Sequence, residues 1–75
     1  MAITTAILVV ADANWVDVED VVDDTIGMRG SFYTEEYFND VWLYLENMNW
    51  TDVDEIDAAL IRAGFDVIEV RDASR

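Results

Sequence analysis

Residues 34–48 read TEEYFNDVWLYLENM. Thr34 is a preferred N-cap residue, and Glu35 and Glu36 then fall in the first turn, where negative charge meets the positive end of the helix dipole. Large apolar side chains follow at spacings of three and four, which is the period of one helix face. They are Tyr37, Phe38, Val41, Trp42, Leu45 and Met48. The pattern predicts a helix over this segment.

Two elements are predicted upstream of this segment. Ile3–Val10 is a continuous β-branched and aliphatic run, which is typical of a central strand covered on both faces. Asn14 is a candidate N-cap for a helix that ends at Gly27 and Gly30. A strand over Trp15–Glu19 is the alternative, because apolar and acidic residues alternate there. The apolar positions of the predicted helix are Trp15, Val18, Val22 and Ile26.

Two more elements are predicted downstream. Thr51 and Asp54 resemble a capping box, with Asp in place of the usual Glu or Gln. The helix that they open ends at Gly64, which is placed as a C-cap glycine. Phe65–Val70 is predicted as a closing strand whose acidic residues break strict alternation, as a β-bulge or an edge position allows. The inward residues of the helix are Val53, Ile56, Leu60 and Ala63.

The predicted fold class is α+β, in a single domain over residues 1–75 with the order β-α-α-α-β. The two terminal strands pair with each other, and three helices pack on them. Two paired strands are marginal by themselves, and 53% of the residues are hydrophobic, which is more than a thin core needs. A homodimer is therefore considered, because pairing between two copies would widen the sheet.

Charge is the most unusual property of the chain. The chain contains seventeen acidic residues and only four basic ones, all arginine, and its formal net charge is -13. Like charges within about one Debye length, roughly 8 Å at physiological salt, repel one another and destabilise a compact domain. Three uses could explain this charge: a surface for a basic partner, a cation site, or adaptation of the proteome to salt.

Residue types exclude most kinds of chemistry. The chain holds no cysteine and no histidine, so a thiolate metal site and histidine acid–base catalysis are excluded. A calcium loop that begins at Asp12 fails, because Val16 and Asp17 stand where a ligand and a glycine are required. No phosphate-binding or nucleophile motif is present. We therefore predict a protein that is not an enzyme and that has no cofactor and no specific metal site.

The acidic residues follow helical spacing. Asp17, Asp20 and Asp24 are three and four apart, and each residue of a helix rises 1.5 Å, so successive carboxylates rise by about 4.5 to 6 Å. Phosphates along one DNA strand rise by roughly 3.4 Å each. Such a strip fits a groove built for a nucleic-acid backbone, although a solvated helix face is the alternative. The predicted contact residues are Asp17, Glu19, Asp20, Asp23 and Asp24 on one helix and Asp52, Asp54, Glu55 and Asp57 on another.

The segment Gly27–Tyr33 adds a second group of candidate contact residues. Arg29, Phe32 and Tyr33 lie between or directly after glycines, and arginine and aromatic residues are enriched at interface hot spots. The alternative is that Phe32 and Tyr33 pack against the start of the helix predicted over residues 34–48.

At the level of a class, the carboxylate pattern of this small, cysteine-free chain resembles phage inhibitors of host DNA-handling proteins. Anti-CRISPR proteins, anti-restriction DNA mimics and uracil-DNA glycosylase inhibitors are examples. The resemblance implies a non-enzymatic protein that blocks a basic, nucleic-acid-binding host protein. The blocker itself is expected to bind no nucleic acid. The other function considered is a salt-adapted or regulatory homodimeric interaction domain without mimicry.

No membrane association is predicted. The chain has no stretch of about 20 apolar residues, and Met1–Val10 lacks the basic region and the cleavage site of a signal peptide. If the resemblance holds, the protein acts in the cytoplasm of the bacterial host.

Overall fold

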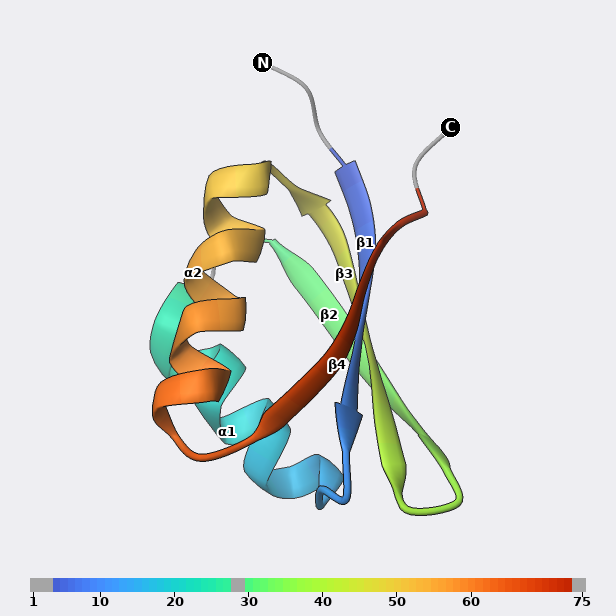
Figure 1. Cartoon of the computed structure of the whole chain (residues 1–75). Coiled ribbons are helices and arrows are strands. Elements are labelled where there is room, and N and C mark those ends of the chain that lie inside the picture. The colour runs from blue at the N-terminus through green and yellow to red at the C-terminus, as the bar shows by residue number, and fades with distance from the viewer. Residues whose placement is uncertain (1–3, 28–29, 74–75) are drawn as a thin grey trace.

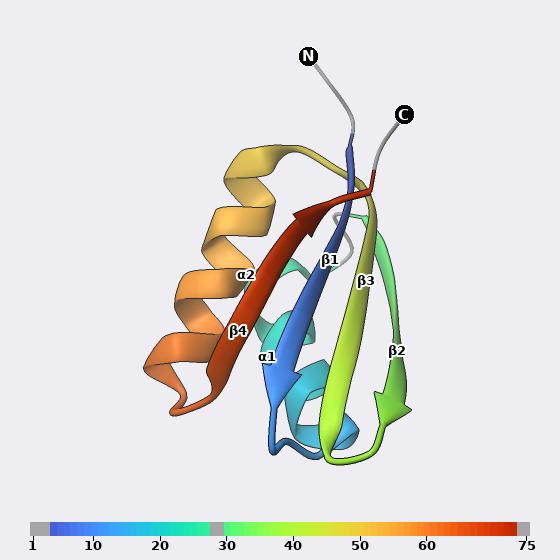
Figure 2. The ribbon, with the colours of Figure 1, turned by 45° about the vertical axis from the view of Figure 1, so that its right-hand side comes forward.

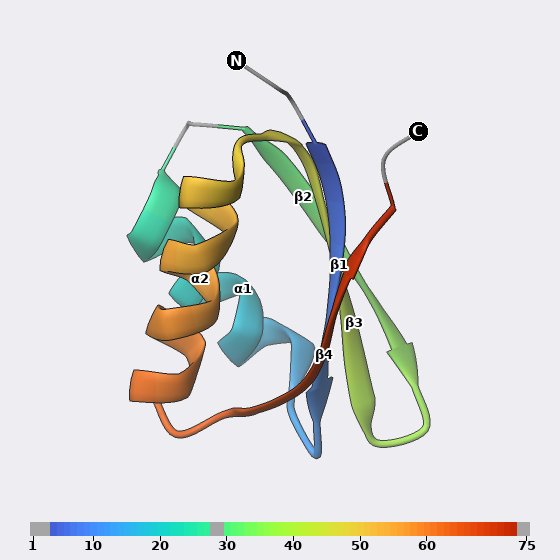
Figure 3. The same cartoon turned by 45° about the horizontal axis from the view of Figure 1, so that its top comes forward.

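A computed structural model describes residues 4–27 and 30–73. The elements are β1 (Thr4–Ala11), α1 (Trp15–Ile26), β2 (Ser31–Tyr37), β3 (Asp40–Met48), α2 (Trp50–Arg62) and β4 (Asp66–Asp72). The four strands form one antiparallel sheet in the order β2-β3-β1-β4 (Figure 2). Both helices lie on one side of this sheet, and the other side is open (Figures 1 and 3). The connections are those of the ferredoxin-like split β-α-β arrangement.

The helix predicted over residues 34–48 is wrong, and with it the β-α-α-α-β order. The segment is a β-hairpin, in which β2 ends at Tyr37, β3 begins at Asp40, and these two residues pair directly. The run from Val41 to Leu45 is apolar at every position, so it satisfies a helical period and a strand period equally well. In the structure every second side chain of this run is fully buried, which is the period of a strand. These side chains are Val41, Leu43 and Leu45.

The core lies between the sheet and the helix pair. In β1, Ala6, Leu8 and Val10 are fully buried on the helix side. β1 is an inner strand, as its sequence predicts, but the helices cover only one of its two faces (Figure 1). The helices contribute side chains at spacings of three and four, as amphipathic helices do. These are Val18, Val22 and Ile26 from α1 and Val53, Ile56 and Leu60 from α2. The predicted inward residues of both helices are thus confirmed, except that Trp15 and Ala63 are exposed.

The helix predicted after Asn14 is confirmed, and the alternative strand over Trp15–Glu19 is wrong. Asn14 Oδ1 accepts a hydrogen bond from the Val16 N–H at 2.9 Å, and α1 ends at Gly27, whose φ of 57° favours glycine. The N-cap of α2 is Asn49 and not Thr51. Its Oδ1 accepts from the Asp52 N–H at 2.8 Å.

The predicted pairing of the two terminal strands is observed. β1 and β4 pair antiparallel, and a register shift between Val9 and Val10 marks the irregularity that the acidic residues of β4 suggested. β4 lies at one edge of the sheet. No helix among the described residues is long and apolar enough to cross a membrane.

Candidate interaction surfaces

The outer face of α1 carries three of the predicted contact residues. Asp17, Asp20 and Asp24 are all exposed, and helical geometry places them opposite the buried stripe of α1. No ion pair with these three carboxylates is found among residues 4–27 and 30–73. Their charges therefore face solvent without a described cation beside them.

Glu19 belongs to a different side of α1. Its Oε2 accepts a hydrogen bond from the Thr34 hydroxyl of β2 at 2.7 Å. Thr34 is thus a strand residue that holds α1 against the edge of the sheet, and not the N-cap that the sequence suggested. Asp23 is also exposed. It directly follows the buried Val22, so it lies about 100° around the helix from that residue and outside the buried stripe. Glu19 therefore links α1 to the sheet, whereas Asp17, Asp20, Asp23 and Asp24 lie on the exposed surface of α1.

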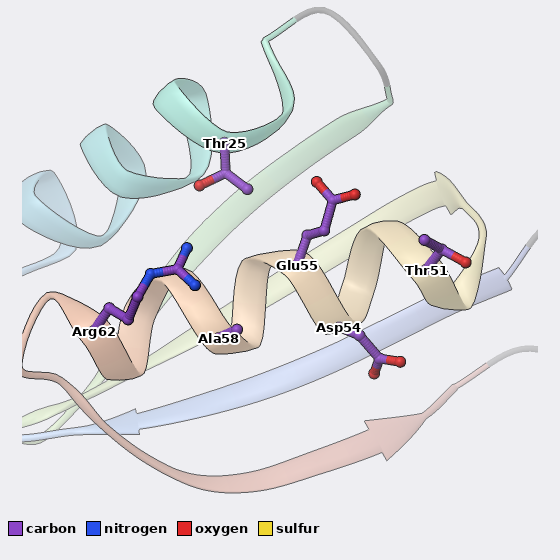
Figure 4. Close-up of a pocket in the computed structure, with 6 residues that line it drawn as sticks. All are labelled: Thr25, Thr51, Asp54, Glu55, Ala58 and Arg62. Carbon is purple, nitrogen blue, oxygen red and sulfur yellow. The ribbon is translucent and has the colours of Figure 1, made fainter.

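The four acidic residues predicted on the other helix do not form one strip. Asp54 and Glu55 are exposed, whereas Asp52 and Asp57 are half-buried. Glu55 points toward α1, and Asp54 points to the opposite side of α2 (Figure 4). The negative charge of α2 is therefore divided between two sides of the helix.

A shallow pocket of about 380 Å³ lies between the outer sides of the two helices (Figure 4). Ala58 forms part of its wall, Glu55 and Arg62 extend along α2 beside it, and Thr25 faces them from α1. Arg62 is exposed in the last turn of α2, where a positive charge stabilises the helix dipole. Among the described residues, no group of three or more acidic side chains lies close enough to hold a metal ion.

The open side of the sheet carries an aromatic cluster that the sequence analysis missed. The rings of Tyr33 and Tyr44 stack with centroids 4.5 Å apart and an interplanar angle of 9°, and Tyr37 meets Trp42 edge to face at 5.1 Å. The Arg71 guanidinium lies 5.5 Å from the centroid of the Trp42 ring. We call these five side chains the aromatic face. The alternation of Tyr33, Glu35 and Tyr37 was the signal for it, but the helix predicted over residues 34–48 hid this alternation.

Tyr44 has an altered acidity within the aromatic face. Burial raises the pKa of its phenol above the usual range, and hydrogen bonds with Glu35 and Tyr37 raise it further. The hydroxyl is thus held in its protonated form, as the adjacent carboxylate of Glu35 requires.

The structure does not place the three candidate contact residues of Gly27–Tyr33 on one described surface. Arg29 lies outside the described residues. Phe32 and Tyr33 belong to β2 and not to a loop: Phe32 packs against the core, whereas Tyr33 is 48% exposed on the open side. Because residues 34–48 form no helix, the alternative that both rings pack against its start is also wrong.

Comparison of the chain with protein-family models, with curated proteins and with solved structures finds no match in any of the three. The interaction surfaces must therefore be interpreted from their own chemistry, because a fold arrangement by itself does not define a function.

Proposed function

We propose that the chain is a non-enzymatic inhibitor that presents a nucleic-acid-like acidic surface to a basic host protein. The target class is a bacterial defence or DNA-handling protein, such as a CRISPR, restriction or repair component, in the cytoplasm of the host. The single observation that carries the proposal is the exposed row of Asp17, Asp20 and Asp24 on the outer face of α1.

The spacing of this row supports the proposal. Asp17 and Asp20 differ by three residues and Asp20 and Asp24 by four, so their Cα atoms rise by about 4.5 and 6 Å along a rigid helix. A DNA strand places its phosphates at a comparable axial rise of roughly 3.4 Å. Lysine and arginine side chains that contact successive phosphates can therefore meet successive carboxylates without a large movement.

The composition around this row also supports the proposal. Residues 11–26 contain six acidic residues and no basic one, whereas ordinary solvated surfaces mix the two signs. Asp23, also on α1, widens the exposed acidic area. With a net charge of -13, the isolated chain repels nucleic acid and attracts proteins that bind it.

The second candidate is a salt-adapted or regulatory interaction domain without mimicry, and the aromatic face favours it. Tyr33 and Tyr37 are 48% and 43% exposed on the open side of the sheet, away from the helices. Exposed tyrosines are typical contact residues in protein interfaces. In this second function the acidic helices only keep the domain soluble, and the open side makes the contact.

A competition experiment distinguishes the two candidates. The immobilised chain is exposed to a bacterial lysate, and bound proteins are released with a short DNA duplex or with sodium chloride at matched ionic strength. The same binding is measured for D17K/D20K/D24K, for a control with an equal change of charge on the strands, E36K/E46K/D66K, and for Y33A/Y37A.

Mimicry predicts that DNA releases the bound protein more effectively than the salt does. It also predicts that D17K/D20K/D24K loses binding while E36K/E46K/D66K keeps it, because the two variants carry the same net charge and differ only in location. Binding that DNA does not release, that survives the α1 reversal and that is lost in Y33A/Y37A would assign the contact to the aromatic face and overturn the proposal.

A further inference from the structure

β4 is an edge strand of the sheet. It pairs with β1 on one side, and no strand among the described residues pairs with it on the other (Figure 2). Its apolar side chains are unusually accessible, with Ile68 55% and Val70 45% exposed. An exposed apolar edge of this kind is a template for pairing with another strand.

The backbone groups of Val70 point to this free edge. The Ala73 N–H donates to the Thr5 carbonyl at 2.8 Å, so these opposed residues form a hydrogen-bonded pair. Directly opposed residues in an antiparallel ladder alternate between hydrogen-bonded and non-hydrogen-bonded pairs. In the observed register, Arg71 opposite Ile7 is then a hydrogen-bonded pair and Val70 opposite Leu8 is not. The N–H and C=O of Val70 are consequently directed away from β1.

We propose that two copies of the chain pair through β4, antiparallel about a two-fold axis at Val70, to form a continuous eight-stranded sheet. In this arrangement Val70 of each copy exchanges both backbone hydrogen bonds with Val70 of the other. This second-copy interface is independent of the proposed inhibitor function. It uses the edge of the sheet opposite β2, and α1 contacts β2, so the acidic row of each copy stays accessible.

The charges of β4 select this register. Glu69 and Arg71 lie opposite Val9 and Ile7 on the open side of the sheet, where they form an ion pair within one strand. A two-fold axis at Glu69 would oppose two glutamates, and one at Arg71 would oppose two arginines. An axis at Val70 instead sets Glu69 of each copy opposite Arg71 of the other, and cross-strand pairs of opposite charge are stabilising. The five donors of each guanidinium allow contact with both glutamates.

The other edge of the sheet lacks this complementarity. β2 (Ser31–Tyr37) carries Glu35 and Glu36 and no basic residue, so pairing of β2 with β2 of another copy brings together only like charges. Pairing of β2 with β4 would join two different edges, which leads to open chains of molecules and not to a closed dimer. β4 is therefore the edge that fits a second copy.

The experiment uses two charge-reversal variants that are complementary to each other. E69R carries arginine at positions 69 and 71, and its net charge is -11. R71E carries glutamate at these two positions, and its net charge is -15. The wild type has a net charge of -13. Each variant opposes like charges in its own dimer. A mixed dimer of E69R with R71E opposes unlike charges at both positions and has the same total charge as the wild-type dimer.

Association is measured by sedimentation equilibrium at protein concentrations up to about 1 mM, in about 0.3 M salt to screen the repulsion between the acidic chains. We expect a wild-type dimer, and a dissociation constant about tenfold or more higher for E69R alone and for R71E alone. An equimolar mixture, and the double swap E69R/R71E, should restore association. Circular dichroism establishes that each variant is folded, and restoration in the mixture excludes misfolding as the cause of the loss.

Three results would each overturn the proposal. The wild-type chain could be monomeric over this whole concentration range. The single variants could associate as tightly as the wild type, which would place the interface elsewhere, with the aromatic face as the next surface to test. The mixture could fail to associate although both variants are folded, which would exclude the pairing of Glu69 with Arg71 of a second copy.

Discussion

The hydroxyl of Thr34 in β2 donates a hydrogen bond to the Glu19 carboxylate of α1, with 2.7 Å between the two oxygens. It is a side-chain link between the edge of the sheet and the helix that carries the acidic row. Both residues are half-buried. The orientation of the proposed contact surface thus depends in part on a residue of the sheet.

Replacing Thr34 with valine tests this link. Valine keeps the β-branched shape but leaves the Glu19 carboxylate without its donor, so we expect the free energy of unfolding to fall by about 1–2 kcal/mol. Urea denaturation measures this change. Thr51→Val is the control, because Thr51 is exposed and does not cap α2. An equal loss in both variants would show that the link contributes nothing specific.

Phe38 in the turn between β2 and β3 is expected to weaken the hairpin. Its φ is 59°, a region that side chains other than glycine rarely adopt, and its ring is fully exposed, so no packing offsets the strain. Phe38→Gly should therefore raise the free energy of unfolding by roughly 0.5–1 kcal/mol. Asn39→Gly, at the neighbouring turn position without a positive φ, should give no gain in thermal denaturation.

Tyr44 gives the stability of the domain a dependence on alkaline pH. Its pKa is raised in the folded chain, whereas in the unfolded chain it ionises near its ordinary value of about 10. The unfolded state therefore loses this proton first, and the contribution of Tyr44, complete below about pH 10, is lost as the pH rises above that value. Urea denaturation across an alkaline pH series should show this decline in the wild type. The decline should be smaller in Tyr44→Phe but unchanged in Tyr33→Phe.

A salt series separates mimicry from adaptation to salt. If the acidic surface serves a partner, the domain should be folded at about 0.1 M salt and gain only modest stability as its self-repulsion is screened. Circular dichroism across the series measures this. A chain that unfolds below molar salt would instead support the salt-adapted alternative.

The helices and the terminal strands were predictable because each carries a local signal. Asn14 and Gly27 mark the ends of α1, and Ile3–Val10 is too uniformly apolar for an amphipathic surface helix. The hairpin was not predictable in the same way. Its turn contains no glycine or proline, and Phe38 itself adopts the positive φ. Asn39 and Asp40 were the available turn signals, but the apolar residues on both sides of them fit one helix.

For the candidate contact surface too, the features with a local sequence signal were predictable and the others were not. Asp17, Asp20 and Asp24 were placed correctly on one face of α1, since helical spacing alone determines their alignment. Glu19 was grouped with this row because it flanks the row in the sequence, and its hydrogen bond with Thr34 was not predictable while Thr34 was expected to cap a helix. The alternation of Tyr33, Glu35 and Tyr37 was a signal for one strand face, but the stacking of Tyr33 on Tyr44 depends on the register of β2 against β3, which the unrecognised turn sets.

The central position of β1 also has a consequence for how the chain folds. Leu8 pairs with Leu43, 35 residues away, and with Val70, 62 residues away. The first strand to be synthesised thus depends on the last for one of its two ladders, and contacts between such distant residues slow folding because a long loop must close before they form. On the ribosome, β1 can complete its pairing only after β4 has emerged.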